Sequence, residues 1–258
     1  MRETLEAVAR GELSVEAAMA DLAGYATTDA GRFDAARERR TGIPEGILAE
    51  GKTAEETAGL VATAVETTGS ALATRVDGAT AAAVTDHLAD QHPEADVDYD
   101  ERARTLVAHG PAYDPPALDA RAGVVTAGTS DAHAAGEAAV VLREMGAAVT
   151  RVDDVGVASI ARLLDQLDVV REQDVLVIAA GREGALPTVA AGLVDAPVIG
   201  LPVSTGYGYG GDGEAALAGM LQSCTPLAVV NVDAGFTAGA QAGLVARALD
   251  RARDRTAE

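Results

Sequence analysis

The sequence is poor in cysteine, large aromatic residues and lysine. Its 258 residues include one cysteine, no tryptophan and two phenylalanines, and Lys52 is the single lysine. One cysteine excludes an intrachain disulfide and a metal site built from several cysteines. No stretch approaches the roughly 18 apolar residues that a membrane span needs, and the opening segment MRETLEAVARGELSVEAAMADLAG is mixed and helical, unlike a signal peptide. We therefore expect a soluble cytoplasmic protein with no membrane partner.

Basic residues are scarce as a class. The chain has 20 Lys and Arg against 40 Asp and Glu, a formal net charge of −20 at pH 7. This balance argues against a nucleic-acid partner, because phosphates need Lys and Arg to replace their counterions. The acids are dispersed along the chain instead of forming one tail, which is typical of adaptation to high salt. We expect a halophilic protein that binds no nucleic acid.

Apolar residues are plentiful but small, at 48% hydrophobic and 3% aromatic, so a core of Ala, Val, Leu and Ile is expected and disorder is not. Residues 1–118 are uneven. Helical spacing runs over 1–22 and again over 53–73, where Thr53 and Glu56 have capping-box spacing. Asp114-Pro115-Pro116 indicates a linker. We predict a smaller α+β N-terminal domain with its linker over 1–118 and a second domain over 119–258.

The pattern becomes regular after residue 120. Apolar runs of strand length alternate with helical stretches, and the runs are AGVVTA, AAVTRV, VLVIAA, APVIGL and LAVVNV. The helical stretches are expected over 131–145, 157–167, 185–193, 213–221 and 238–253. Strands that are apolar throughout indicate a parallel sheet covered on both faces. The predicted fold class is therefore α/β, with a three-layer αβα C-terminal domain.

Ligands in such sheets bind outside the carboxyl ends of the strands. Functional residues should therefore lie in the five segments that follow the strands: 127–133, 153–159, 179–188, 202–213 and 231–239. All five segments contain glycine and small polar groups.

Two of these loops carry the strongest indications of ligand contact. Gly128–Asp131 opens a helix, where backbone N–H groups favour a phosphate or carboxylate; simple capping by Ser130 or Asp131 explains it equally well. The loop lacks the G-x-G-x-x-G dinucleotide pattern. Segment 206–211 is rich in glycine and holds Tyr207, so its backbone can approach a ligand and its rings can stack on one. The alternative is a mobile surface loop.

Glu183 and Cys224 are the candidate catalytic groups. A carboxylate after the most hydrophobic strand can act as general acid or base where desolvation raises its pKa; an ion pair with Arg182 is the alternative. Lone cysteines are most often small buried apolar groups, yet Cys224 lies between a predicted helix and a predicted strand, with the access that a nucleophile needs. His133 fits a solvated helix face. No His, Asp and Glu grouping has convincing metal-ligand spacing.

Several motifs together resemble the LarB family. They are GTSD (128–131), DVGVAS–RLL (154–164), GREGALP (181–187), PVIGLPVSTGYG (197–208), MLQSC (220–224) and VVNVDAGFTAG (229–239), preceded by RTGIPE (40–45), GKT (51–53) and TR (74–75). That family makes pyridinium-3,5-biscarboxylic acid mononucleotide, the precursor of the nickel-pincer nucleotide cofactor. The second half is also similar to AIR carboxylase (phosphoribosylaminoimidazole carboxylase) of purine synthesis. The resemblance implies an AIR carboxylase-like fold for residues 119–258.

The resemblance implies an enzyme that carboxylates C5 of the pyridinium ring of nicotinic acid adenine dinucleotide and cleaves the phosphoanhydride to release AMP. CO2 or bicarbonate is the co-substrate. No organic cofactor is implied, and Mg²⁺ or another divalent metal can assist the hydrolysis. Because the ring is electron-poor, a nucleophile must first add at C4, and a thiolate adds and leaves well. Cys224 stands where the motif places the family's cysteine.

The resemblance also suggests roles for other residues. Glu183 would move the proton at C5, and Asp131, counted with the catalytic groups, would hold the new carboxylate or a phosphate together with Ser130. Cations of the N-terminal domain are candidates for phosphate or carboxylate contacts: Arg40, Lys52 and Arg75. The remaining expected substrate contacts lie in the loops: Gly128, Thr129, Asp154, Gly156, Gly184, Ala185, Leu186, Pro187, Ser204, Gly206, Tyr207 and Gly208.

The sequence departs from the family pattern at Ala161, usually His, at Arg182, commonly Met, and at Ala234 in the DNGFG pattern. Ala185 stands where AIR carboxylase has a proton-moving His, which argues against the purine reaction. An AIR carboxylase or mutase, whose electron-rich substrate needs no thiol, is nevertheless the alternative enzyme. A non-catalytic nucleotide-binding module is a third interpretation. We expect a homo-oligomer, an octamer by analogy with the related carboxylases.

Overall fold

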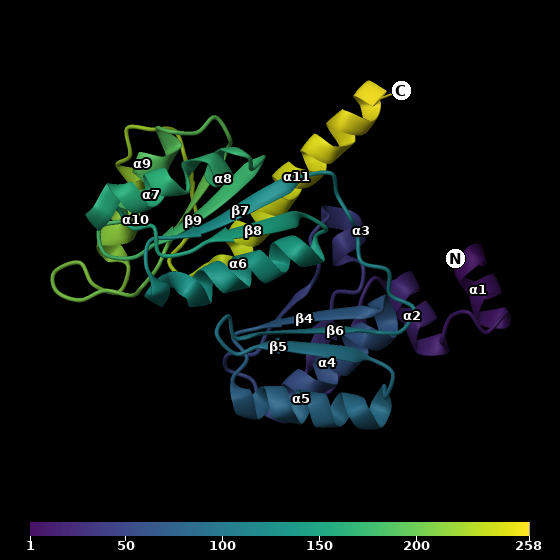
Figure 1. Ribbon diagram of the computed structural model, residues 1–258. Helices are drawn as coiled ribbons and strands as arrows, with labels where there is room; N and C mark the ends of the chain where they lie inside the picture. The colour runs from purple at the N-terminus through teal and green to yellow at the C-terminus, as the bar shows by residue number, and fades with distance from the viewer. Residues whose placement is uncertain (258) are drawn as a thin grey trace. The chain divides into compact units, whose positions relative to one another are not determined.

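The computed structural model describes residues 1–257. They form two compact units, Met1–Pro115 and Pro116–Glu258, each with its own sheet and helices (Figure 1). The boundary predicted between residues 118 and 119 lies three residues beyond the point where the two units meet. Within the described residues, no helix is both long and apolar enough to cross a membrane.

The first unit combines short helices with a mixed sheet. Its four-stranded sheet has the order β3-β4-β6-β5, with β3 parallel to β4 and the other pairs antiparallel. A two-stranded hairpin, β1-β2, stands apart. The strands are β1 (Ala26–Thr28), β2 (Gly31–Phe33), β3 (Gly46–Leu48), β4 (Ser70–Thr74), β5 (Asp96–Asp100) and β6 (Thr105–His109). The helices are α1 (Arg2–Ala9), α2 (Val15–Ala23), α3 (Arg37–Thr41), α4 (Ala54–Thr68) and α5 (Gly78–Gln91).

The spacing of apolar residues predicted the helices of this unit with incorrect bounds. The spacing over 1–22 corresponds to two helices, because Gly11 takes a positive φ and Ser14 caps α2. The predicted helix over 53–73 ends at Thr68, where Gly69 adopts the left-handed conformation that terminates helices, and residues 70–74 form β4. The capping box is confirmed: Thr53 Oγ1 accepts from Glu56 N–H at 3.1 Å, and Glu56 accepts from Thr53 N–H at 2.8 Å.

The second unit is built on a five-stranded parallel sheet with the order β11-β10-β9-β7-β8. Its strands are β7 (Arg121–Thr126), β8 (Ala148–Val152), β9 (Val175–Ala180), β10 (Val198–Pro202) and β11 (Ala228–Val229). Its helices are η1 (Thr129–Asp131), α6 (Ala132–Glu144), η2 (Val157–Ser159), α7 (Ile160–Asp165), α8 (Leu167–Arg171), α9 (Ala185–Ala191), α10 (Glu214–Leu221) and α11 (Gly235–Ala257).

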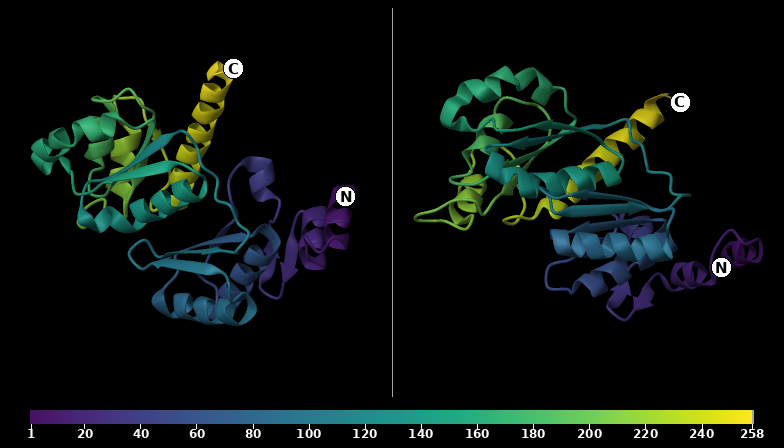
Figure 2. Two further views of the ribbon diagram at one scale, coloured as in Figure 1. Left: turned by 45° about the vertical axis from the view of Figure 1, so that its right-hand side comes forward. Right: turned by 60° about the horizontal axis from the view of Figure 1, so that its bottom comes forward.

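Helices cover both faces of this sheet, which confirms the predicted three-layer α/β class (Figures 1 and 2). Alternate residues of β9 point to opposite faces. Val175, Val177 and Ala179 pack against α6 and α11. Leu176, Ile178 and Ala180 pack against α7, α9 and α10. All six residues of β9 are buried, as expected for a central parallel strand.

Glycines bring α6 and α11 into close contact. Gly235, Gly239 and Gly243 are spaced four apart and lie on one side of α11. A Cβ at Gly239 would lie 2.6 Å from the carbonyl oxygen of Ala138 in α6. The absence of side chains along this stripe therefore sets the separation of the two helices.

Candidate functional site

A pocket lies at the carboxyl ends of the strands in the second unit. Loops after β7, β8, β9 and β10 converge on it, and its volume is about 590 Å³, within the range of small-molecule sites. It is lined by Ala127, Gly128, Ser130, Asp131, Gly156, Val157, Ala158, Arg162, Ala180, Gly181, Arg182, Glu183, Ala185, Leu186, Thr205, Gly206 and Tyr207. Four of the five segments that the topological rule predicted therefore contribute residues to this pocket.

Asp131 is the buried carboxylate of the pocket, with 3% of its surface exposed. Its Oδ2 accepts a hydrogen bond from Gly128 N–H at 2.8 Å, and its Oδ1 accepts one from Thr205 Oγ1 at 3.0 Å. Burial raises the pKa of Asp131 above its ordinary value, although the hydrogen bonds from Gly128 and Thr205 oppose that shift. Asp131 thus connects the loop after β7 with the loop after β10 and can both hold and release a proton.

Three glycines allow these loops to pack directly on their neighbours. A Cβ at Gly181 would lie 2.3 Å from the carbonyl oxygen of Thr205, and one at Gly156 would lie 2.5 Å from that of Ala127. Gly184 has a φ of +66° and faces the backbone of α10 at similarly short range. Any side chain at these positions would push apart the loops that form the pocket walls.

Two arginines line the pocket, and the prediction of substrate contacts missed both. The Arg162 guanidinium pairs with Asp154 at 3.0 Å and donates to the carbonyl oxygen of Gly156 at 3.3 Å. Its Nε is buried and has no hydrogen-bond partner among the described residues. Arg182 lies over the ring of Tyr207, with 4.4 Å between the guanidinium carbon and the ring centroid. These cations provide the charge that an anionic ligand requires.

Arg162 could have been found from the topology. It lies in the first turn of α7, within the predicted helix 157–167 and directly after a predicted functional loop. Arg182 was noted only as a departure from the family pattern, yet it stands in the loop that follows the most buried strand. Thr205 is the third residue missed, and its hydroxyl bonds the Asp131 carboxylate.

The pocket gathers about half of the predicted contacts of the second unit: Gly128, Ser130, Asp131, Gly156, Glu183, Ala185, Leu186, Gly206 and Tyr207. Other predicted residues belong to the same loops but are not in its lining: Thr129, Asp154, Gly184, Pro187, Ser204 and Gly208. Asp154 positions Arg162, and the Ser204 N–H donates to Asp233 at 3.0 Å. The segment after β11 therefore supports the loop after β10.

Glu183 is exposed at the pocket wall beside Arg182. The sequence suggested it as a general acid or base where desolvation raises its pKa, but the buried carboxylate of the pocket is Asp131. Glu183 can contact a ligand, because it lines this pocket and also a smaller one that shares Tyr207 and includes Tyr209.

Cys224 is not among the residues that line the pocket. It follows α10 and precedes β11, which is parallel to β10. The next residue, Thr225, donates from its Oγ1 to the carbonyl oxygen of Thr188 in α9 at 2.9 Å. The thiol is exposed, as predicted for an accessible position. The expected grouping of Cys224 with Glu183 and Asp131 stays a prediction.

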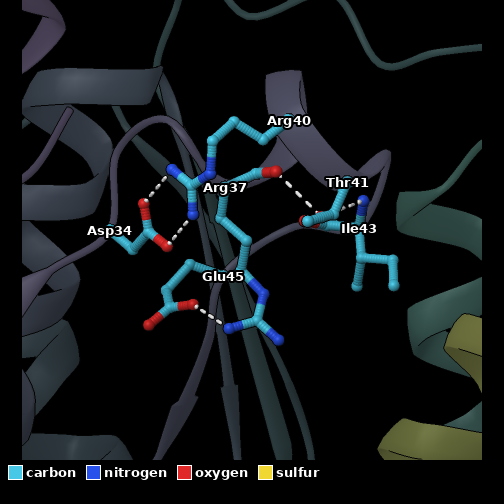
Figure 3. A network of polar contacts seen from close by, with 6 residues as sticks. All are labelled: Asp34, Arg37, Arg40, Thr41, Ile43 and Glu45. Carbon is cyan, nitrogen blue, oxygen red and sulfur yellow. Dashed lines mark hydrogen bonds and ion pairs between the residues drawn. The ribbon is translucent and has the colours of Figure 1, made fainter.

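The predicted cations of the first unit are engaged within that unit. Arg40 holds the Asp34 carboxylate through two hydrogen bonds of 2.9 and 2.7 Å, and Arg37 pairs with Glu45 at 2.9 Å (Figure 3). The Arg40 guanidinium lowers the pKa of Asp34. The two other cations behave similarly: Arg75 pairs with Glu50 at 2.9 Å, and Lys52 Nζ donates to the Leu48 carbonyl at 2.6 Å. None of these residues lines the pocket of the second unit.

The first unit has a pocket of its own, of about 730 Å³. His92, Pro93, Tyr113 and several acidic side chains line it, including Glu66 and Glu94. It contains no predicted site residue, and its negative charge does not suit a phosphate. The smaller pocket of the second unit is therefore the candidate site.

Among the residues that the structure describes, no three or more His, Cys, Asp and Glu side chains form a cluster that could hold a metal ion. The divalent cation that the resemblance allows stays a prediction.

Comparisons with known proteins match both units. The family model described as "LarB/PurE-like N-terminal domain" matches residues 25–110, and the model for "AIR carboxylase" matches residues 121–257. An uncharacterized protein of Methanocaldococcus jannaschii is 38% identical over 228 residues, which is 85% of each chain. A crystal structure of a PurE2 variant from Treponema denticola is 17% identical with a TM-score of 0.36, covering 55% of this chain and 98% of that one.

Proposed function

The chain belongs to the LarB family, with a LarB/PurE-like N-terminal domain followed by an AIR carboxylase domain, and from this we propose that it carboxylates the pyridinium ring of nicotinic acid adenine dinucleotide. The products would be pyridinium-3,5-biscarboxylic acid mononucleotide and AMP. Membership supports a carboxylase-type enzyme, and the substrate and the thiolate mechanism are our proposal.

The proposed ring chemistry begins with the thiolate of Cys224. Its electron pair forms a C–S bond to C4 of the pyridinium, and the ring becomes an enamine with a nucleophilic C5. C5 then attacks CO2, forming a C–C bond and leaving an iminium at N1. Loss of the C5 proton restores the enamine, and expulsion of the thiolate restores the aromatic ring. The balance is CO2 gained and one proton released, with no change in oxidation state of the protein.

Pocket residues provide the proton transfer and the binding. Asp131 has a raised pKa because it is buried, so it can accept the C5 proton and return it to solvent. Glu183 at the pocket wall is the second proton carrier. Arg162 and Arg182 offset the negative charge of the ring carboxylates and the phosphates. The Tyr207 ring, already stacked under Arg182, can cover the pyridinium face.

Phosphoanhydride cleavage is the second part of the proposed reaction. One water adds to a phosphorus atom, the bridging P–O bond breaks, and AMP leaves the mononucleotide. Charge neutralisation by Arg162 and Arg182 would favour the leaving phosphate. Arg40, Lys52 and Arg75 remain proposed contacts for the rest of the dinucleotide.

One observation carries the proposal. The AIR carboxylase domain has Ala185 where the purine enzyme's motif has a proton-moving His, yet it keeps a cysteine in the MLQSC segment. An electron-rich aminoimidazole needs no thiol, whereas a pyridinium needs a nucleophile before it can attack CO2. The combination therefore favours the pyridinium substrate.

The test is a comparison of two substrates under one set of conditions. The protein is incubated with bicarbonate and either nicotinic acid adenine dinucleotide or aminoimidazole ribonucleotide, and products are identified by mass. We expect AMP and the dicarboxylated mononucleotide from the first substrate only. Turnover of the aminoimidazole alone would instead establish the purine-type reaction. Dinucleotide binding without turnover of either substrate would establish a non-catalytic module.

A further inference from the structure

The pocket of the first unit lies at one edge of the four-stranded sheet. The amino ends of β4 and β5 meet the carboxyl end of β6 at this edge, because His109 pairs with Ser70 of β4 and with Asp96 of β5. α4 leads into β4 and α5 leads toward β5, so the ends of both helices reach the same edge. The pocket between them has a volume of about 730 Å³, which is that of a small-molecule site.

The walls of this pocket carry negative charge from two sources. Residues 65–68 at the end of α4 and residues 91–92 at the end of α5 line it, and the last carbonyl groups of a helix carry the negative end of its dipole. The side chains of Glu66, Glu94 and Asp114 add carboxylates. The electrostatic potential in the pocket therefore favours a cation.

The usual cationic side chains are missing from these helix ends. A Lys, Arg or His in the last turn commonly interacts with the final carbonyl groups and the dipole of a helix. Neither α4 nor α5 has a basic residue in its last turn. Among the described residues that line the pocket, none is Arg or Lys, and His92 is the one imidazole. A positively charged ligand would supply the charge that the helix ends lack.

The rest of the lining is apolar and aromatic, which suits a cation with an apolar body. Leu13 and Ala95 line the pocket and are half-buried. The ring of Tyr113 is also part of the wall, and it stacks on His109 with 4.8 Å between the ring centroids. Stacking holds this ring in place without a ligand, and aromatic rings attract ammonium groups.

We propose that the pocket of the first unit binds a small organic cation. Its ammonium group lies at the carbonyl ends of α4 and α5, and its apolar body lies on Leu13, Ala95 and Tyr113. A nucleotide or another anion is repelled by the carboxylates, so this ligand differs from the substrate that we propose for the second unit. All residues that line the pocket belong to the first unit, and the inference does not depend on the proposed reaction.

The first test compares three probes that share a phenylethyl or benzyl body and differ in charge: phenethylammonium, 2-phenylethanol and phenylacetate. Each is titrated into the protein by calorimetry, at a KCl concentration where circular dichroism shows the protein to be folded. We expect one phenethylammonium to bind per chain, at least about tenfold more tightly than 2-phenylethanol, and no binding of phenylacetate. Equal affinities for the three probes, or no binding of phenethylammonium up to about 10 mM, would overturn the proposal.

The second test separates this pocket from the general attraction of cations to a chain of net charge −20. Glu66→Gln/Glu94→Gln removes two carboxylates of the pocket wall, and each exposed ion pair contributes up to about fivefold in affinity. We expect phenethylammonium to bind about threefold to twentyfold more weakly. Glu101→Gln/Glu172→Gln is the matched control, because it changes the net charge equally at exposed positions outside the pocket. An equal loss in the two double variants, or no loss in the first, would contradict binding at this site.

A third measurement uses Ala112, an exposed residue of the pocket wall. Ala112→Lys places an ammonium group of the chain itself at the pocket, where it competes with the probe. We expect Ala112→Lys to lose phenethylammonium binding and Ala112→Gln, with a neutral side chain of similar length, to keep it. Binding by Ala112→Lys at the wild-type affinity would overturn the proposal, whichever substrate the second unit takes.

Discussion

Asp131 is the residue of the pocket whose acidity its surroundings alter most clearly. It is nearly fully buried, and it joins two loops by accepting hydrogen bonds from Gly128 and Thr205. The sequence placed both Asp131 and Glu183 in the site, but it considered desolvation only for Glu183. Burial depends on which loops close over a side chain, and the packing of Gly181 on Thr205 could not be read from the sequence alone.

The first prediction concerns the pH dependence of stability at Asp131. Its pKa is raised on folding because burial penalises the charged carboxylate. As the pH rises from the ordinary value of 3.8 through the folded value, the unfolded state loses its proton first, and the folded state loses stability. Relative to Asp131→Asn, the wild type should therefore become less stable over this window and stay constant above it. Urea unfolding of both proteins from pH 4 upward measures this difference, and a difference that grows in the opposite direction would contradict the account.

The second prediction concerns Arg162. Its unpartnered Nε and its place in the pocket wall suit a ligand phosphate or carboxylate. Hydrogen bonds to charged groups contribute about 1.5–3 kcal/mol, so Arg162→Gln should raise KM for the dinucleotide about tenfold to a hundredfold. Arg171→Gln is the control, since Arg171 donates to the Leu193 carbonyl outside the pocket. An unchanged KM in Arg162→Gln would remove this residue from substrate binding.

Secondary structure was predictable where the sequence repeats a simple physical pattern. Four of the five strands of the second unit were found with errors of at most two residues at an end, because they are runs of Val, Ile and Ala. The fifth run, LAVVNV, was predicted as a strand of six residues, but β11 contains only Ala228 and Val229. The first unit was harder, because β4 follows α4 after a single residue and its apolar side chains continue the helical spacing. Gly69 was the signal for the break, since its φ of +79° ends the helix. Spacing without attention to that glycine extended the helix to residue 73.

Substitution by alanine at two helical glycines should change the free energy of unfolding in opposite directions. At Gly239 in α11 a Cβ would clash with the backbone of α6 at 2.6 Å, so Gly239→Ala should destabilise the protein by about 1–3 kcal/mol. Gly59 in α4 has no atom within 4 Å of its Cβ position, so Gly59→Ala should stabilise by about 0.5–1 kcal/mol, since alanine is the better helix former. Denaturant unfolding measures both. Equal effects of the two substitutions would contradict the described packing of α6 on α11.

At the scale of the whole molecule, charge is the dominant feature. A net charge of −20 on 258 residues produces a repulsion between surface carboxylates that favours the unfolded chain. Salt weakens this repulsion, because it screens charges that lie farther apart than about 10 Å at 0.1 M and at shorter distances as the salt concentration rises. We predict that the free energy of unfolding rises as KCl is increased from about 0.1 M to 2 M. Urea titrations at fixed KCl concentrations measure it. Greatest stability at low ionic strength would contradict the interpretation of the acids as an adaptation to salt.

The sequence predicted at which edge of the sheet the pocket lies, but it did not predict all of the residues that form the pocket. The topological rule placed the pocket at the carboxyl edge of the sheet, and the motifs singled out Cys224. The place of Cys224 after α10, beside α9, followed only from the strand order and from the hydrogen bond of Thr225 to α9.

Isotope incorporation tests most directly whether Cys224 enables carboxylation of a pyridinium ring. Wild type and Cys224→Ser, both shown to be folded by circular dichroism, are incubated with nicotinic acid adenine dinucleotide and ¹³C-bicarbonate. We predict that wild type forms a mononucleotide carrying ¹³C in a new carboxyl group at C5, and that Cys224→Ser forms none above the uncatalysed background. Labelling by Cys224→Ser at the wild-type rate would contradict the thiolate mechanism.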